Sequence, residues 1–209
     1  MKENEKLSLE QISERVNNVN IDRDVLAFDM EVEMQNLSFP MRFDGLLLML
    51  VSEGEGAIGI DMRQYELRRD TLIVLHPRNY VYSARTEGLR MDIVACSMNV
   101  VENVLPKLTD LLPLLMHHRA EPVELLGHED AARLREFYTF LRKLMSESDS
   151  VFARKKVMCL LQAALFEMMD IHCRENEISE HQRTRKEEIM AKFILMVSEN
   201  FRKERQVSF

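Results

Sequence analysis

The feature that most constrains this chain is a change in the spacing of its apolar residues near residue 99. Before that point apolar residues alternate with polar ones, as where Phe28 and Met30 alternate with Asp29 and Glu31, and a period of two is typical of strands. After it, apolar residues recur at the spacing of amphipathic helices. A block of strands followed only by helices is typical of α+β proteins.

The predicted strands are short and are separated by turn residues. The continuous apolar run 46–51 predicts a strand buried on both faces. Gly54-Glu55-Gly56 predicts a tight turn after it, because glycine permits the positive φ of hairpin turns. Further strands are expected at 57–62, 65–67, 72–75, 81–84 and 90–98. Such evenly spaced short strands favour a small antiparallel barrel or sandwich.

Helices are expected at both ends of this β-rich block. Ser8 with Gln11 forms a capping-box pattern that predicts a short N-terminal helix. Residues 100–115 have helical spacing, but two prolines break them. Two longer helices are predicted at about 130–146 and 151–174, and Thr184 with Glu187 opens another at the C-terminal end.

The two longer helices carry apolar stripes that predict an antiparallel hairpin. The second helix is apolar around much of its circumference, with Met158, Leu160, Phe166 and Met169 off the main stripe, so it needs a further partner. That partner is either the barrel or a second subunit. For a homodimer, the predicted dimerisation residues are Leu134, Phe137, Leu141, Leu144, Met158, Leu161, Leu165 and Met168.

Composition excludes several classes of protein. No apolar run is long enough to span a membrane and the N-terminus has no signal-peptide pattern, so we expect a cytoplasmic location without membrane contact. The net charge of −7 is unfavourable for binding nucleic acid. The last 29 residues differ, with 7 basic and 4 acidic side chains. Three widely spaced cysteines indicate neither a disulfide framework nor a zinc site.

The residues do not indicate an enzyme. A catalytic metal in a β-barrel needs two or three imidazoles, and the β-rich block has only His76. The adjacent His117 and His118 cannot point the same way and are expected at the surface, and nothing near His172 in the sequence completes a ligand set. No phosphate loop and no nucleophile motif is present. We therefore expect no catalytic residue, no metal and no cofactor.

A pocket for a small ligand inside the barrel is the remaining kind of site. Arginine is notable there because it can hold a carboxylate or phosphate through two hydrogen bonds. The alternative is that Arg42 and Arg90 lie on outer faces or pair with acidic neighbours, and that the methionines only fill the core. The candidate pocket residues are Arg42, Met49, His76, Tyr82, Arg90 and Asp92.

The chain resembles the N-terminal region of AraC-type transcription regulators, especially the form common in Bacteroidetes. The barrel part of the resemblance rests on Gly54-Glu55-Gly56, Tyr65-x-Leu67, the run 70–75 and Pro77. The tail part is more specific: 185–189, Phe193, Val197 and 200–209 are similar to the first helix of the DNA-binding domain and the start of the next. The chain departs from the family pattern where Arg68-Arg69 replaces the usual proline-glycine. It also lacks the metal histidines of enzymatic cupins.

The resemblance implies an α+β fold in which a cupin-like antiparallel β-barrel (a double-stranded β-helix) precedes a helical hairpin and a further helix. The implied domains are a sensor barrel over 1–115, a dimerising hairpin over 116–180, and the first helix of a truncated helix-turn-helix domain over 181–209. An unknown effector in the barrel would bias the placement of the DNA-binding domains. A cyclic-nucleotide-type regulator and a stand-alone non-metal cupin binding protein or isomerase are the alternatives.

Overall fold

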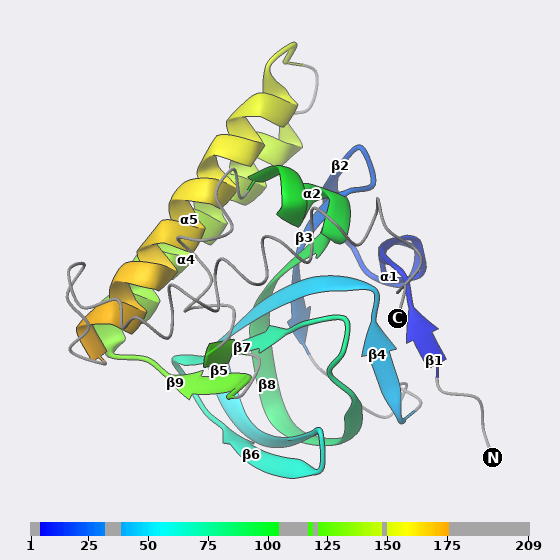
Figure 1. Ribbon diagram of the computed structural model, residues 1–209, viewed down its shortest axis with the longest axis vertical. Coiled ribbons are helices and arrows are strands. Elements are labelled where there is room, and N and C mark those ends of the chain that lie inside the picture. Colours follow the sequence, from blue (N-terminus) through cyan, green and yellow to red (C-terminus); the bar gives the residue numbers. More distant parts are fainter. Residues whose placement is uncertain (1–4, 32–38, 105–116, 119–120, 148–149, 176–209) are drawn as a thin grey trace, which may run out of the picture.

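The computed structural model describes residues 5–31, 39–104, 117–118, 121–147 and 150–175 (Figure 1). Nine strands and four helices lie in these ranges. The strands are β1 (Glu5–Leu7), β2 (Val19–Ile21), β3 (Val25–Glu31), β4 (Met41–Phe43), β5 (Gly45–Ile60), β6 (Arg63–Leu67), β7 (Thr71–Leu75), β8 (Val81–Ser97) and β9 (Val123–Leu125). The helices are α1 (Leu9–Arg15), α2 (Met98–Val104), α4 (His128–Ser146) and α5 (Ala153–Glu175).

Two long antiparallel strands, β5 and β8, form the centre of the sheet. β8 also pairs with β3 and β4, while β5 also pairs with β6 and β7, and β9 extends the sheet beyond β7. All pairings are antiparallel except that of β1 with β4. Both long strands curve, so the sheet folds around an apolar interior (Figure 1). The cupin-like α+β fold predicted from the sequence is confirmed in this arrangement of a curved antiparallel sheet followed by two long helices.

The turn predicted at Gly54-Glu55-Gly56 is wrong, because β5 continues through these residues. Its register against β8 shifts between Val51 and Glu53 and again between Glu53 and Glu55, which is the signature of a β-bulge. Gly54 has φ +78°, and a Cβ there would lie 2.2 Å from the carbonyl oxygen of Gly88. The glycines therefore bend a continuous strand and let two backbones approach closely.

The chain reverses direction one strand segment later, at Asp61 and Met62. Their φ values are +46° and +70°, and Ile60 pairs with Arg63 across the turn. Two residues with positive φ are typical of the two-residue turns that join antiparallel strands. The two strands predicted at 81–84 and 90–98 are likewise one strand, β8, because the sequence between them stays paired with β5.

Two apolar clusters occupy opposite faces of the curved sheet. The inner cluster includes Phe28, Val51 and Met91 and lines the inside of the barrel. The outer cluster joins Leu50, Leu72 and other outward-facing strand residues to α4 and α5. The long strands alternate between these clusters, and for this reason the run 46–51 is apolar at every position.

The helices agree with the sequence pattern. The capping box of α1 is present: the Gln11 backbone N–H donates to Ser8 Oγ at 3.3 Å, and the Ser8 backbone N–H donates to Gln11 Oε1 at 2.9 Å. α4 and α5 confirm the helices predicted at 130–146 and 151–174 and lie side by side along one face of the sheet (Figure 1). Among the described residues, no helix is long and apolar enough to cross a membrane.

The predicted domain boundaries fall outside the described residues. α2 corresponds to the start of the helical segment expected at 100–115, and the remainder of that segment is not described. The helix and linker expected beyond residue 175, including 181–209, also lie outside.

Candidate functional site

The barrel encloses a cavity of about 160 Å³. Its walls come from α1 and from β3, β4, β5, β7 and β8, and they are almost entirely apolar. A dry cavity of roughly 150 Å³ is enough to hold an aromatic ring. The side chains that line it are Leu7, Ile12, Arg15, Val16, Phe28, Met30, Phe39, Met41, Arg42, Phe43, Leu47, Met49, Ile58, Leu75, Asn79, Val81, Met91 and Ile93.

Three polar side chains line this cavity, and two of them are arginines. Arg42 Nη1 donates a hydrogen bond to the Tyr80 hydroxyl at 3.3 Å, and its guanidinium carbon lies 5.6 Å from the centre of that ring. Arg15 is exposed at the end of α1. The third, Asn79, is buried and donates to Asp61 Oδ2 at 2.6 Å, so it serves to hold the neighbouring turn. The arginines are therefore the groups able to meet an anion at an otherwise apolar cavity.

Only two of the six predicted pocket residues, Arg42 and Met49, line this cavity. Asp92 is on the opposite face of the sheet, beneath α4 and α5. His76 follows β7 and lies with the histidines of the helical region. The other two, Tyr82 and Arg90, are exposed, and Arg90 Nη1 lies 3.4 Å from Glu53 Oε2. The prediction that these four residues line the cavity is therefore wrong. Alternation along β8 explains why its three predicted residues miss the cavity, since their neighbours Val81, Met91 and Ile93 point into it instead.

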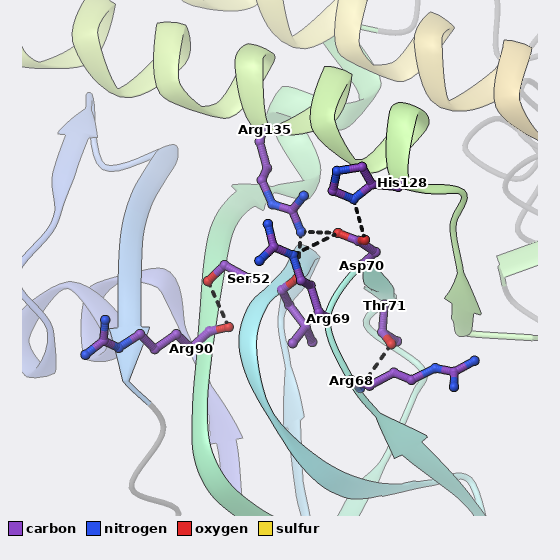
Figure 2. Close-up of polar contacts among 9 residues, drawn as sticks. Ser52, Arg68, Arg69, Asp70, Thr71, Arg90, His128 and Arg135 are labelled. Atoms are coloured by element: carbon purple, nitrogen blue, oxygen red, sulfur yellow. Dashed lines mark hydrogen bonds and ion pairs between the residues drawn. The ribbon is translucent and has the colours of Figure 1, made fainter.

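The barrel is joined to α4 by a polar contact that the sequence analysis missed. Arg135 Nη2 donates to Asp70 Oδ1 at 2.5 Å and to the Val51 carbonyl oxygen at 2.9 Å. His128 Nδ1 lies 3.0 Å from Asp70 Oδ2, and Figure 2 shows both side chains reaching down from α4 to the carboxylate. Burial alone would raise the pKa of Asp70, but the hydrogen bonds from His128 and Arg135 outweigh it and lower the pKa.

A second polar contact lies further along α4. Asp29 of β3 accepts hydrogen bonds from the Tyr138 hydroxyl at 2.6 Å and from Arg142. Asp92 lies directly opposite Asp29 in the β3–β8 register. Burial, and then the charge of Asp29, raise the pKa of Asp92. Burial, and then the hydrogen bond to Asp29, raise the pKa of Tyr138.

The four α4 side chains in these contacts, His128, Arg135, Tyr138 and Arg142, are here called the α4 polar face. Three of them follow one another at seven-residue spacing, which places them on one side of a helix. That regular spacing of basic residues beside the apolar stripe was the signal in the sequence that could have revealed them. Their acidic partners on the strands have no comparable pattern.

The residues predicted to form a dimer interface are instead packed inside the chain, and this corrects the prediction. Leu134, Leu141, Leu144, Leu161, Leu165 and Met168 are all buried in the outer cluster, and Met158 packs against it. Phe137 lines a small space between the sheet and the helices, together with Leu134 and Asp92. A second subunit could reach these side chains only if the helices left the sheet. The barrel is therefore the partner that covers the apolar stripes.

Other apolar side chains of the hairpin face solvent. Phe140 of α4 is 51% exposed and Phe166 of α5 is 43% exposed. Cys159 and Ala163 are also exposed and lie on the same side of α5 as Phe166 by helical spacing. These four residues are here called the outer hairpin face. Val151 and Phe152, at the start of α5, are exposed as well.

The histidines of the helical region are not arranged as predicted. His118 and His172 are buried, although His118 was expected at the surface. The His117 ring centre lies 5.2 Å from that of His118 and 4.4 Å from that of His172. The sequence could not show this, because α5 brings His172 to this place from more than fifty positions away.

Comparison with known proteins gives similar solved structures only. No family model and no curated relative matches the chain. Apo ToxT from Vibrio cholerae is 10% identical with a TM-score of 0.46, over 88% of this chain and 67% of that one. The AraC-like transcriptional activator CuxR is 12% identical with a TM-score of 0.40, over 88% of this chain and 60% of that one. The cupin domain of Schizosaccharomyces pombe Cnp3 is 13% identical with a TM-score of 0.32, over 39% of this chain and 62% of that one.

Cupin domains and AraC-like regulators are thus both among the similar structures. The chain spans about 60 to 67% of the length of these three. At these identities the similarity concerns the fold only and assigns no function.

Proposed function

We propose that this chain is the effector-sensing region of an AraC-type transcription regulator, and that it binds a ligand without catalysing a reaction. The observation that carries the proposal is the apolar cavity of about 160 Å³ with arginines at its edge. Such a cavity suits a small, mostly apolar molecule with one anionic group, held by Arg42. The proposed regulatory role comes from the resemblance of the sequence motifs to this family.

The α4 polar face offers a route from the cavity to the helices. The strands β3, β5 and β8 contribute cavity residues from their inner faces, while Asp29 and the Val51 carbonyl group on β3 and β5 contact α4. A ligand that shifts these strands would change the geometry of both contacts. In the proposed mechanism the ligand thereby biases the position of the hairpin, and with it the DNA-binding domains.

Two further parts of the proposal concern partners. A second copy of the chain is proposed to dock on the outer hairpin face, because exposed aromatic side chains are characteristic of contact sites and Phe140 and Phe166 belong to two helices that pack on each other. DNA is proposed to be bound by the family's helix-turn-helix domain, of which 181–209 resemble the beginning. The acidic charge of the chain, −7, agrees with a DNA contact outside the barrel.

The experiment is a calorimetric titration of the chain with two molecules of the same shape, 4-ethylbenzoate and the uncharged 4-ethylbenzamide. We expect the anion to bind more tightly, and we expect Arg42→Met to remove that preference. The matched control is Arg78→Met, since Arg78 is exposed and does not line the cavity. Equal weakening by both variants, or binding of neither molecule, would contradict the proposed site. Binding of cyclic adenosine monophosphate in the same assay would favour the cyclic-nucleotide alternative.

A further inference from the structure

Four of the six histidines gather at one place outside the barrel cavity. His76 follows β7, His172 belongs to the last turns of α5, and His117 and His118 form a short helical turn before β9. The His117 ring contacts those of His118 and His172, and His76 is close enough to lower the pKa of His118. Glu124 of β9 completes the group: its Oε2 lies 3.7 Å from His117 Nε2.

The donor atoms of His117, His118 and Glu124 lie close to the separations that a metal ion needs. One atom from each residue lies within 4.8 Å of the other two. In a tetrahedral zinc site with bonds near 2.1 Å, neighbouring ligand atoms are about 3.4 Å apart. Side-chain rotations that move the donor atoms by about 1 Å would therefore allow all three to bind one ion.

The state of His118 is the second observation that points to a ligand. Its side chain is almost fully buried, at 2% exposure, and its Nδ1 has no hydrogen-bond partner among the described residues. The ring is also hydrogen-bonded to the backbone of Glu121. An imidazole anchored to the backbone through one nitrogen, with the other directed at a metal, is the usual arrangement of a histidine ligand.

Burial, and then the nearby histidines, lower the pKa of His118 to about 3. An unpartnered buried ring nitrogen costs about 1 to 3 kcal/mol in an apolar surrounding, and a metal ion would remove that cost.

We propose that His117, His118 and Glu124 bind a divalent transition-metal ion of the zinc class, with His172 placed to supply a fourth ligand. Imidazole nitrogens with one carboxylate suit Zn²⁺, Co²⁺, Ni²⁺ and Cu²⁺ better than Mg²⁺ or Ca²⁺. The site is separate from the cavity of the proposed function, so either can be correct without the other. The ion would fasten α5 to β9, which pairs with β7 of the barrel.

The test is a calorimetric titration of the whole chain, without an affinity tag, with Zn²⁺. We expect one ion per chain and, for both His118→Ala and Glu124→Gln, affinity lowered by at least about tenfold. Cys159→Ser and His128→Gln are the controls: Cys159 is an exposed thiol, His128 lies outside the cluster, and neither change should alter binding.

Two additional measurements keep the result interpretable if His118→Ala fails to fold. Glu124→Gln is nearly the same size as the native side chain, and its fold is checked by circular dichroism without metal. Zn²⁺ should raise the melting temperature of the native chain but not that of this variant. Co²⁺ should give the visible absorption of a four-coordinate site. The proposal is overturned if Zn²⁺ does not bind, or if it binds folded Glu124→Gln as tightly as the native chain.

Discussion

Asp70 and Arg135 lie 65 residues apart in the chain and form an ion pair of 2.5 Å between the barrel and α4. Asp70 is 13% exposed and its φ is +70°, so it sits in a backbone conformation that few residues adopt. Its backbone is also bonded at both ends: its N–H donates to Val51 and its carbonyl oxygen accepts from Leu126. One residue therefore connects β5, β7, the segment before α4, and α4 itself.

Replacing either partner of this pair should destabilise the chain. Asp70→Asn keeps a side chain that tolerates positive φ but removes the charge, and we expect it to lower the free energy of unfolding by about 2 kcal/mol. Arg135→Met should cost a similar amount, and the double variant should cost less than the sum of the two. Urea denaturation followed by circular dichroism measures all three. Additive effects would show that the pair is not coupled.

The same pair should produce a dependence of stability on pH. The pKa of Asp70 is lower in the folded chain than its ordinary 3.8, so the folded state holds the ionised form more tightly. Its contribution is complete above the ordinary pKa and is lost as the pH falls through the lowered value, below about pH 4. Asp70→Asn should therefore lose less stability than the native chain between about pH 4 and pH 2. Parallel curves for the two proteins would contradict this assignment.

The two facing aspartates should respond in opposite directions to the same substitution. Asp92→Asn removes a carboxylate whose raised pKa reflects burial and the charge of Asp29, and should stabilise the chain near pH 7 by up to about 1 kcal/mol. Asp29→Asn removes the charged acceptor of Tyr138 and Arg142 and should destabilise it by about 1 to 2 kcal/mol. The melting temperatures of the two variants, compared with that of the native chain, test this prediction. A loss of stability in both variants would mean that Asp92 makes a favourable contact.

The close approach of β5 and β8 predicts different tolerances at Gly54 of β5 and Gly88 of β8. Gly54→Ala places a Cβ 2.2 Å from a backbone oxygen and should destabilise the chain by more than about 3 kcal/mol. Gly88 has φ +58° with nothing within 4 Å of the added carbon, so Gly88→Ala should cost only about 1 kcal/mol. Denaturant midpoints compare them, and equal costs would mean that the close approach at Gly54 is not present.

Self-association should depend on the outer hairpin face and not on the stripes first predicted for it. Phe166→Glu puts a charge on this face and should leave the fold intact while weakening a dimer by about tenfold or more. Leu161→Ala, at a buried position, should instead destabilise the monomer by about 3 kcal/mol. Sedimentation velocity over a range of concentrations separates the two effects. A dimer unaffected by Phe166→Glu would place the interface elsewhere.

The sequence predicted those parts of the fold that follow from periodicity and capping. The Ser8 capping box, the long helices and the apolar run of β5 depend on residues close together in the chain, so pattern alone could reveal them. The bulge at Gly54 was mistaken for a turn because glycine supplies positive φ in either case. Only the pairing with β8, more than thirty residues away, distinguishes them.

Most of the site depends on contacts between distant segments. Met49 lines the cavity because strand alternation places it on the inner face, whereas Arg42 reaches the cavity from between two inward-facing residues of β4. Asp70 with Arg135, and His118 with His172, come together only when the helices pack on the sheet. The apolar stripes were assigned to a dimer interface for a related reason: an apolar stripe shows that something covers it, but the sheet and a second subunit leave the same pattern.

The central claim is that binding of a ligand in the barrel cavity changes the structure or dynamics of α4. Amide hydrogen exchange of the chain, measured with and without saturating 4-ethylbenzoate, tests this claim most directly. The account predicts slower exchange in β3, β5 and β8, and a changed rate in α4 that is lost in Arg135→Met. Unchanged exchange in the cavity strands would contradict the binding site. Protection of those strands with no change in α4 would contradict the coupling between barrel and hairpin.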